Sequence, residues 1–142
     1  MDAFFKYNFQ VSFEETNVVG NVYFANYFVW QGKCREAFLA EYAPQVLQDF
    51  AAGHGMITKE SSCEFFEESF AFNKIEIRMY LSRLTRTSIT MLFEYFRIEE
   101  LAEVLLAKGK QTTFWASPEQ KIAMLPDYLY DAVKQFTGVE TA

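Results

Sequence analysis

The sequence predicts an α+β fold in which one curved antiparallel sheet wraps around a single long helix. Two observations lead to this prediction. One strand-like segment precedes a long helical segment, and segments with a period of two follow it. The first half of the helical segment is also apolar on nearly every side. The chain has 142 residues and no Pro- or Ser-rich linker, so we expect a single domain over residues 1–142.

The first strand is predicted over Phe5–Phe13. Its apolar residues recur at every second position and would share one face: Phe5, Tyr7, Phe9, Val11 and Phe13. A polar turn follows over Glu14–Asn21. Gly20 lies in this turn, and glycine permits the positive φ that a tight turn before a helix requires.

A long helix is predicted over Tyr23–Tyr42, and it ends before Pro44 because the residue preceding a proline avoids helical geometry. From Tyr23 to Trp30 the residues are apolar nearly all round. A helix that is apolar on every side is buried on every side, which a wrapped sheet would achieve. The second half, Gln31–Glu41, regains charge and is expected to emerge at the surface.

The remaining chain is predicted to contain two short helices and four strands. One helix covers Pro44–Ala52, and the last covers Asp127–Phe136, where Pro126 suits a helix start and Gly138 a helix end. The strands are rich in Thr, Val and aromatic residues: Ile57–Phe66, Lys74–Leu81, Ser88–Ile98 and Val104–Ala116.

The composition excludes several classes of function. A net charge of −6 and a pI of about 4.8 disfavour nucleic acid and anionic membrane surfaces as partners. The start of the chain lacks a signal peptide pattern, and no apolar run is long enough to span a bilayer. We therefore expect a cytoplasmic protein. Aromatic residues make up 18%, which indicates a large aromatic core, an apolar pocket, or both.

The chain has too few cysteine and histidine residues for a typical metal site or thiol active site. Cys34 and Cys63 are far apart in the sequence, and His54 is the only histidine, so no zinc signature can be assembled. We expect no metal and two reduced thiols. A catalytic pair would have to use His54, whose glycine-rich surroundings equally suit a solvated loop residue.

Two features around the long helix are candidates for a site. The turn at Gly20 leads into a helix whose first N–H groups are unpaired, and such groups form an anion site or an oxyanion hole. The alternative is an ordinary glycine turn. Arg35 shares a stripe with Phe24, Phe28 and Gln31, so its guanidinium is either paired or faces a ligand. The alternative here is an exposed arginine that is paired with a carboxylate.

Four segments carry a resemblance to a known family: Phe13–Asn17, Gly20–Phe24, Trp30–Glu36 and Cys63–Phe66. They resemble hotdog-fold proteins of the 4-hydroxybenzoyl-CoA-thioesterase type, and most closely the thioesterases of enediyne polyketide biosynthesis. The resemblance implies a hotdog fold and no cofactor. The wider family has a carboxylate where this chain has Asn17, and the enediyne subfamily is similar to this chain in carrying asparagine there.

The resemblance also implies roles for individual residues. The Phe24 backbone N–H would bind the thioester oxygen, Asn17 would orient the water, and Arg35 would stabilise developing negative charge. The Tyr27 hydroxyl would line the pocket as a donor. The residues expected to contact substrate are Gly20, Asn21, Tyr23, Phe28, Glu64 and Phe66. We interpret Tyr23, together with Trp30, chiefly as an aromatic residue that packs in the core and fixes the helix.

The implied function is release of a polyene β-keto acyl chain from the acyl-carrier-protein domain of an iterative enediyne polyketide synthase. The same electrostatics would hold an enolate, so decarboxylation of the released acid is chemically reasonable. Partners would be that carrier protein and further copies of the chain, as a dimer of dimers. Two alternatives stay open: a general acyl-CoA thioesterase, and a non-catalytic hotdog module that binds an apolar ligand.

Overall fold

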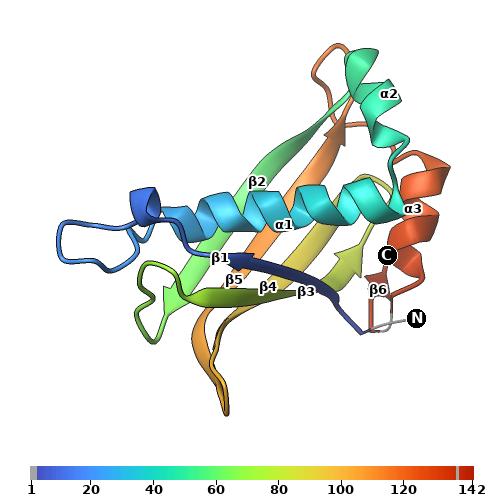
Figure 1. The fold of residues 1–142 in the computed structure, drawn as a ribbon. Helices are drawn as coiled ribbons and strands as arrows, with labels where there is room; N and C mark the ends of the chain where they lie inside the picture. Colours follow the sequence, from blue (N-terminus) through green and yellow to red (C-terminus); the bar gives the residue numbers. More distant parts are fainter. Residues whose placement is uncertain (1–2, 137) are drawn as a thin grey trace.

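A computed structural model describes residues 3–136 and 138–142 (Figure 1). A short 3-10 helix, Phe13–Glu15, separates the first strand from the long helix. The strands are β1 Phe5–Gln10, β2 Gly55–Phe65, β3 Lys74–Leu84, β4 Ser88–Ile98, β5 Glu103–Ala116 and β6 Glu140–Thr141. The helices are α1 Asn26–Tyr42, α2 Val46–Ala51 and α3 Asp127–Lys134.

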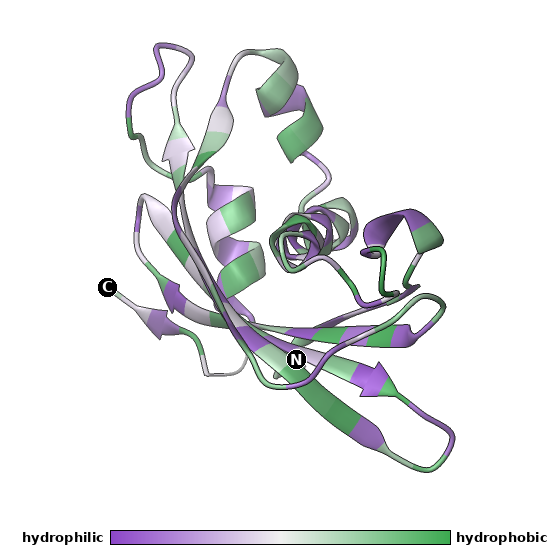
Figure 2. Cartoon of the chain, turned by 90° about the vertical axis from the view of Figure 1, so that its left-hand side faces the viewer, coloured by the Kyte–Doolittle hydropathy of each residue, from purple (hydrophilic) through white to green (hydrophobic). Residues whose placement is uncertain are grey.

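The strands form one sheet in the order β1-β3-β4-β5-β2, with every neighbouring pair antiparallel, and β6 adds a short parallel pairing to β3. Helix α1 crosses the sheet in Figure 1, and Figure 2 shows it nearly end-on against one face of the curved strands. This arrangement confirms the predicted architecture. Among the described residues, no helix is both long and apolar enough to cross a membrane.

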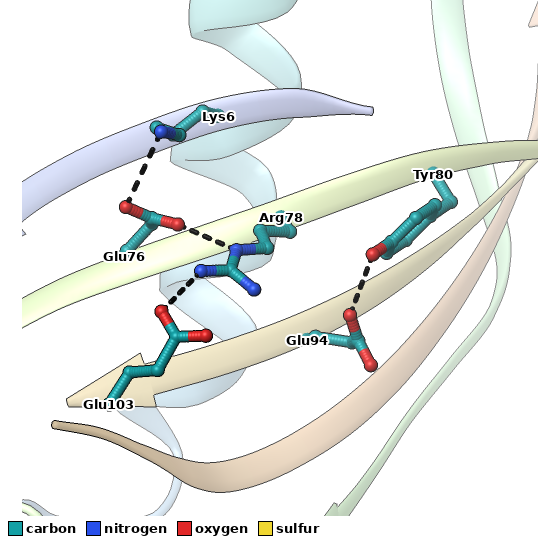
Figure 3. Close-up of polar contacts among 6 residues, drawn as sticks. All are labelled: Lys6, Glu76, Arg78, Tyr80, Glu94 and Glu103. Atoms are coloured by element: carbon teal, nitrogen blue, oxygen red, sulfur yellow. Dashed lines mark hydrogen bonds and ion pairs between the residues drawn. The ribbon is translucent and has the colours of Figure 1, made fainter. Parts of the chain in front are cut away.

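The two faces of the sheet differ in chemistry. On β3, Ile75, Ile77 and Met79 point to the α1 side and are fully buried. The intervening residues lie on the opposite face, where Figure 3 shows α1 behind the strands. There Arg78 forms ion pairs of 2.6 Å with both Glu76 and Glu103. Strand alternation therefore separates an apolar inner face from a charged outer face.

The first strand is shorter than predicted. It ends at Gln10, and Phe13 is exposed within the 3-10 helix instead of continuing the buried face. The reason is a local polar contact. The Glu15 carboxylate accepts hydrogen bonds from both the backbone N–H and the hydroxyl of Ser12, and this turns the chain away from the sheet.

Helix α1 begins at Asn26 and not at Tyr23, because the Tyr23 N–H still bonds the Glu15 carbonyl at 3.0 Å. The expectation that its first half is buried on every side is wrong for this chain. Val29 is 51% exposed and Tyr23 49% exposed. A single sheet covers only one side of the helix, and the other side stays open to solvent.

The later elements lie close to their predicted positions, with ends shifted by a few residues. Strand β4 matches its predicted bounds, whereas α2 starts later than predicted, and α3 ends at Lys134. Pro126 precedes α3 as its N-cap residue. Strand β6 was not predicted, because two residues are too few to show a period.

Candidate active site

The loop before α1 is a compact hydrogen-bonded turn around Asn17. Its N–H donates to the Asn21 carbonyl at 2.7 Å, and the Gly20 N–H donates back to the Asn17 carbonyl at 2.9 Å. Gly20 has φ of +94°, so the expected positive φ is confirmed, and a residue with a side chain would be strained there. The turn presents the Asn17 side chain to solvent, 3.3 Å from the Asn21 amide oxygen.

The entrance to α1 leaves backbone donors available, and the Phe24 N–H is one of them. The N–H groups of Asn26 and Tyr27 bond the carbonyls of Tyr23 and Phe24 in turn. Within the described part of the chain, the Phe24 N–H has no acceptor. An unpaired N–H at a helix start is a suitable donor for a developing oxyanion. The geometry is thus consistent with the role that the resemblance implies for Phe24.

A cavity of about 190 Å³ lies beside this donor. Of the predicted site residues, it brings together Asn17, Asn21, Phe24 and Tyr27. The Tyr27 hydroxyl shares a 2.8 Å hydrogen bond with Ser69, and burial raises the pKa of Tyr27. The phenol therefore stays protonated near neutral pH and can act as a hydrogen-bond donor.

The sequence did not identify the rest of the cavity wall, which consists of Val22, Phe65, Glu67, Glu68 and Ser69. The loop after β2 is tied to the α1 entrance because the Val22 N–H donates to the Ser69 carbonyl at 2.8 Å. Arg97 of β4 holds the same loop through the Glu68 carbonyl. This loop has no hydrophobic period, so only the folded chain shows that it faces Asn17.

Phe65 lines the cavity, and its predicted neighbour Phe66 does not. The Phe65 ring lies 5.1 Å from the Tyr27 ring and 6.2 Å from the Phe24 ring, measured between centroids, and both contacts are edge-to-face. Strand alternation separates the two phenylalanines, since successive side chains point to opposite faces. Alternation along the strand was the sequence signal that could have favoured Phe65 over Phe66 as a substrate contact.

Five of the six predicted contact residues lie outside this wall, and Asn21 alone of that set lines it. Glu64 and Phe66 are exposed, Phe28 is half-buried on α1, and Gly20 contributes backbone geometry only. Their contact with substrate stays a prediction. Among the aromatic residues assigned to the core, Trp30 is fully buried as expected. Tyr23 is not, because it lies on the open side of the helix entrance next to the Phe24 ring.

Arg35 lies in a different depression, of about 260 Å³, which is lined by Arg35, Glu36, Leu39, Phe50, His54, Gly55 and Met56. Its Nη1 donates to the Gln111 amide oxygen at 2.8 Å and lies 3.5 Å from the Thr58 hydroxyl. No carboxylate of a described residue lies within 4.0 Å of its guanidinium nitrogens. The alternative of an exposed arginine paired with a carboxylate does not describe this side chain.

The surroundings of Arg35 change the pKa of its guanidinium. Burial lowers the pKa of Arg35 from its ordinary value, although the guanidinium stays charged near neutral pH. Its Nε is buried and has no hydrogen-bond partner within residues 3–136 and 138–142. Arg35 is thus a half-buried cation whose close hydrogen-bond partner, the Gln111 amide, is neutral. Such a guanidinium can bind an anionic group.

Within one chain the predicted catalytic residues line two separate cavities. Tyr27 and Arg35 are both on α1, eight residues apart, which corresponds to about 12 Å along the helix axis. The structure thus brings Asn17, Phe24 and Tyr27 together, and places Arg35 one cavity further along the helix.

The histidine and the cysteines do not form a nucleophilic pair. His54 is half-buried and stacks on Trp115 with ring centroids 5.7 Å apart, so it is not the solvated loop residue of the alternative interpretation. Burial raises the pKa of Cys63 to about 11 and that of Cys34 to about 12. Both thiols are protonated near neutral pH, and neither is a ready nucleophile. The described residues contain no cluster of three metal-ligating side chains.

Comparison with known proteins gives a consistent result. A family model described as the thioesterase-like superfamily matches residues 11–133. No curated protein sequence matches the chain. Among solved structures, the dynemicin thioesterase, whose crystal structures reveal induced-fit and allosteric effects upon polyene binding, is 37% identical. The match covers 98% of this chain and 99% of that one, with a TM-score of 0.88.

Two more distant structures share the fold. A 1,4-dihydroxy-2-naphthoyl-CoA thioesterase from Synechocystis is 20% identical, with 93% of this chain and 96% of that chain covered and a TM-score of 0.84. A 4-hydroxybenzoyl-CoA thioesterase variant with an aspartate replaced by asparagine, in complex with 4-hydroxybenzoyl-CoA, is 15% identical. There 89% of this chain and 96% of that chain are covered, with a TM-score of 0.80. The sheet wrapped on α1 is the hotdog fold, and the chain belongs to the thioesterase-like superfamily.

Proposed function

We propose that this thioesterase releases a polyene β-keto acyl chain from the acyl-carrier-protein domain of an iterative enediyne polyketide synthase, by hydrolysis of the thioester. The observation that carries the proposal is the 37% identity, over nearly the whole of both chains, to a thioesterase that binds polyene. The aromatic wall of Phe24, Tyr27 and Phe65 supports it, because flat rings pack well on a rigid conjugated chain.

The mechanism we propose depends on electrostatic stabilisation. The thioester carbonyl oxygen accepts a hydrogen bond from the Phe24 N–H, while the Asn17 amide orients the attacking water. Asn17 has no basic lone pair of useful pKa, so the general-base contribution of roughly 10²–10⁴ in rate is reduced or absent. An oxyanion donor contributes roughly 10²–10³. We therefore expect a slow hydrolase, adequate for a tethered intermediate. A released β-keto acid then loses carbon dioxide through an enolate that the same groups stabilise.

A homo-oligomer, proposed as a dimer of dimers, would explain the two separated half-sites. Strand β2 lies at one edge of the sheet and most of its residues are exposed, as are Val29 and Phe24 on the open side of α1. Open edges and apolar faces of this kind are normally covered. We propose that pairing of two chains covers them and brings Arg35 of one chain to the Asn17 cavity of the other.

A thiol-release assay tests the activity. The protein is incubated with a polyene or simple acyl thioester of a carrier protein and, separately, with the same acyl group on coenzyme A. Release from the carrier protein alone is the expected result. Faster release from coenzyme A would favour a general acyl-CoA thioesterase, and release from neither would leave a non-catalytic binding module.

Complementation tests whether two chains share one site. Asn17→Ala and Arg35→Ala chains, carrying different tags, are coexpressed and purified through both tags, and their hydrolysis is compared with that of each single variant. If one site combines the two residues from different chains, each mixed pair has one intact site of two. Doubly tagged protein should then show about half of the wild-type rate if it is a dimer, and slightly more than about a quarter if it is a dimer of randomly formed dimers. No recovery in doubly tagged protein would contradict a shared site.

A further inference from the structure

A chain of buried amides connects Arg35 to the backbone of the sheet. Gln31 on α1 is 0% exposed and Gln111 on β5 is 4% exposed. The Gln111 amide nitrogen donates to the Gln31 amide oxygen at 3.3 Å, and the Gln111 amide oxygen accepts from Arg35 at 2.8 Å. Two glutamines buried between a helix and a sheet are unusual, because an amide without partners is costly there.

The two ends of this chain fix its polarity. The Gln31 amide nitrogen donates at 3.0 Å to the Ser62 carbonyl, which can only accept. The Gln31 oxygen therefore points the other way, and it accepts from the Ser61 hydroxyl as well as from Gln111. Gln111 must then present its nitrogen to Gln31 and its oxygen to Arg35, which can only donate. Neither amide can flip without losing hydrogen bonds.

A glycine in the middle of a strand makes room for this arrangement. A Cβ added to Gly109 would lie 2.5 Å from the Gln31 amide nitrogen and 3.1 Å from the Ser62 carbonyl oxygen. Glycine weakens a strand interior, and its presence there marks a close approach of another group. The Gln31 amide is that group, so strand β5 is shaped to hold it.

The chain of amides anchors Arg35 without neutralising it. A carboxylate in place of the Gln111 amide would hold the guanidinium more strongly but would cancel its charge. With a neutral acceptor, the guanidinium keeps its charge toward the depression that it lines, and Nη2 has no hydrogen-bond partner among the described residues. Glu36 lines the same depression and acts on Arg35 electrostatically, but among the described residues it forms no ion pair with Arg35 within 4.0 Å.

We propose that Gln111 and Gln31 are positioning residues that hold Arg35 as a cation without a direct carboxylate partner, and that the depression beside Arg35 accordingly takes an anionic group such as a carboxylate or a developing oxyanion. This inference rests on the proposed role of Arg35, but it is tested by binding and not by hydrolysis. The matched probes are octanoate and octanamide, which share a chain and differ in charge.

Calorimetric titration of both probes is carried out on wild type, Gln111→Glu and a control, Gln45→Glu. Gln45 is exposed before α2, so the control adds the same charge away from Arg35. We expect wild type and the control to bind octanoate at least about tenfold more tightly than octanamide. In Gln111→Glu we expect octanoate to weaken at least about tenfold, while octanamide binds as in wild type. A general loss of packing would weaken both probes equally.

An unchanged ratio in Gln111→Glu, or no preference for octanoate in wild type, would overturn the inference. If Gln111→Glu does not fold, Gln111→Met replaces it: the amide anchor is lost, and the octanoate preference must still fall. If wild type prefers octanoate but hydrolyses no thioester, the proposed function fails and the positioning role stands. If wild type hydrolyses thioesters but the ratio never changes, the positioning role alone is wrong.

Discussion

Arg78 and Arg35 lie on opposite faces of the same sheet and are held in opposite ways. Arg78 is ion-paired with both Glu76 and Glu103 (Figure 3). Its guanidinium carbon also lies 4.1 Å from the centroid of the Phe96 ring. Hydrogen bonding to Glu103, reinforced by Glu76, raises the pKa of Arg78. Arg35 has a glutamine amide as its anchor, and burial lowers the pKa of Arg35.

The difference separates a structural cation from a functional one. A paired guanidinium contributes to stability, because its partners satisfy it within the fold. A guanidinium that is anchored but not neutralised attracts an anion from outside, at some cost to stability. The comparison predicts that substitutions at Arg35 change activity and that substitutions at Arg78 change stability.

The largest effect is expected for Arg35→Ala. Hydrolysis of a carrier-protein thioester should fall by about 10² or more, in kcat more than in KM, since the charge acts on the transition state. Lys33→Ala removes an exposed cation from the same helix and should retain full turnover. Near-wild-type turnover in Arg35→Ala would contradict the proposed role of Arg35 in hydrolysis.

The matching substitution on the outer face is Arg78→Met. It deletes two ion pairs and leaves Glu76, which is 8% exposed, with only the more distant Lys6 at 3.8 Å. We expect a loss of about 2 kcal/mol in the free energy of unfolding. Urea denaturation measures it, with Arg83→Met, exposed on the same strand, as the control. A fall in turnover per folded molecule would show that the two faces are coupled.

A smaller effect on turnover is expected for Asn17→Asp. If Asn17 were a degenerate catalytic carboxylate, the aspartate would raise the rate. In an electrostatic site the new charge repels the oxyanion, by about 4 kcal/mol at ~4 Å and an effective dielectric of ~20 before relaxation. Glu67 and Glu68 line the same cavity and add to this repulsion. We therefore expect a rate equal to or about tenfold below that of wild type in single-turnover hydrolysis, and any clear gain would contradict the proposed mechanism.

The smallest effect, a change in stability, is expected at Glu15. The Glu15 carboxylate accepts hydrogen bonds from neutral groups, just as the Arg35 guanidinium donates to a neutral amide. Burial opposes its ionisation, but hydrogen bonds from Ser12 and from Trp30 Nε1, at 2.7 Å, outweigh burial and lower the pKa of Glu15. A lowered pKa stabilises the folded chain above the unfolded carboxyl pKa, and this stability is lost as the pH falls through the folded pKa.

Glu15→Gln should therefore lower the free energy of unfolding by about 1 kcal/mol at pH 7 and flatten its decline in acid. Thermal or urea unfolding of both proteins between neutral and acidic pH measures the difference. Glu14→Gln, at an exposed neighbouring position, is the control and should keep the wild-type slope. An unchanged slope in Glu15→Gln would show that Glu15 is not held as described.

The fold class and the order of elements could be predicted before folding was known, because each depends on local patterns. Alternation along β3 and β4, the restriction before Pro44 and the apolar run entering α1 are all readable within a few residues of each position. The sequence also indicated Asn17, Gly20, Phe24 and Tyr27, which form one continuous segment, and the structure gathers three of them around one cavity.

The distant residues that meet these groups could not be predicted in the same way. Ser69 and Phe65 complete the Asn17 cavity, and Gln111 anchors Arg35 from a strand 76 positions away. Such pairings follow from strand register and from the way the helix crosses the sheet, and no local period encodes either. For the same reason the pattern could not show that one sheet leaves half of α1 uncovered, because burial depends on what packs against a helix and not on its own residues alone.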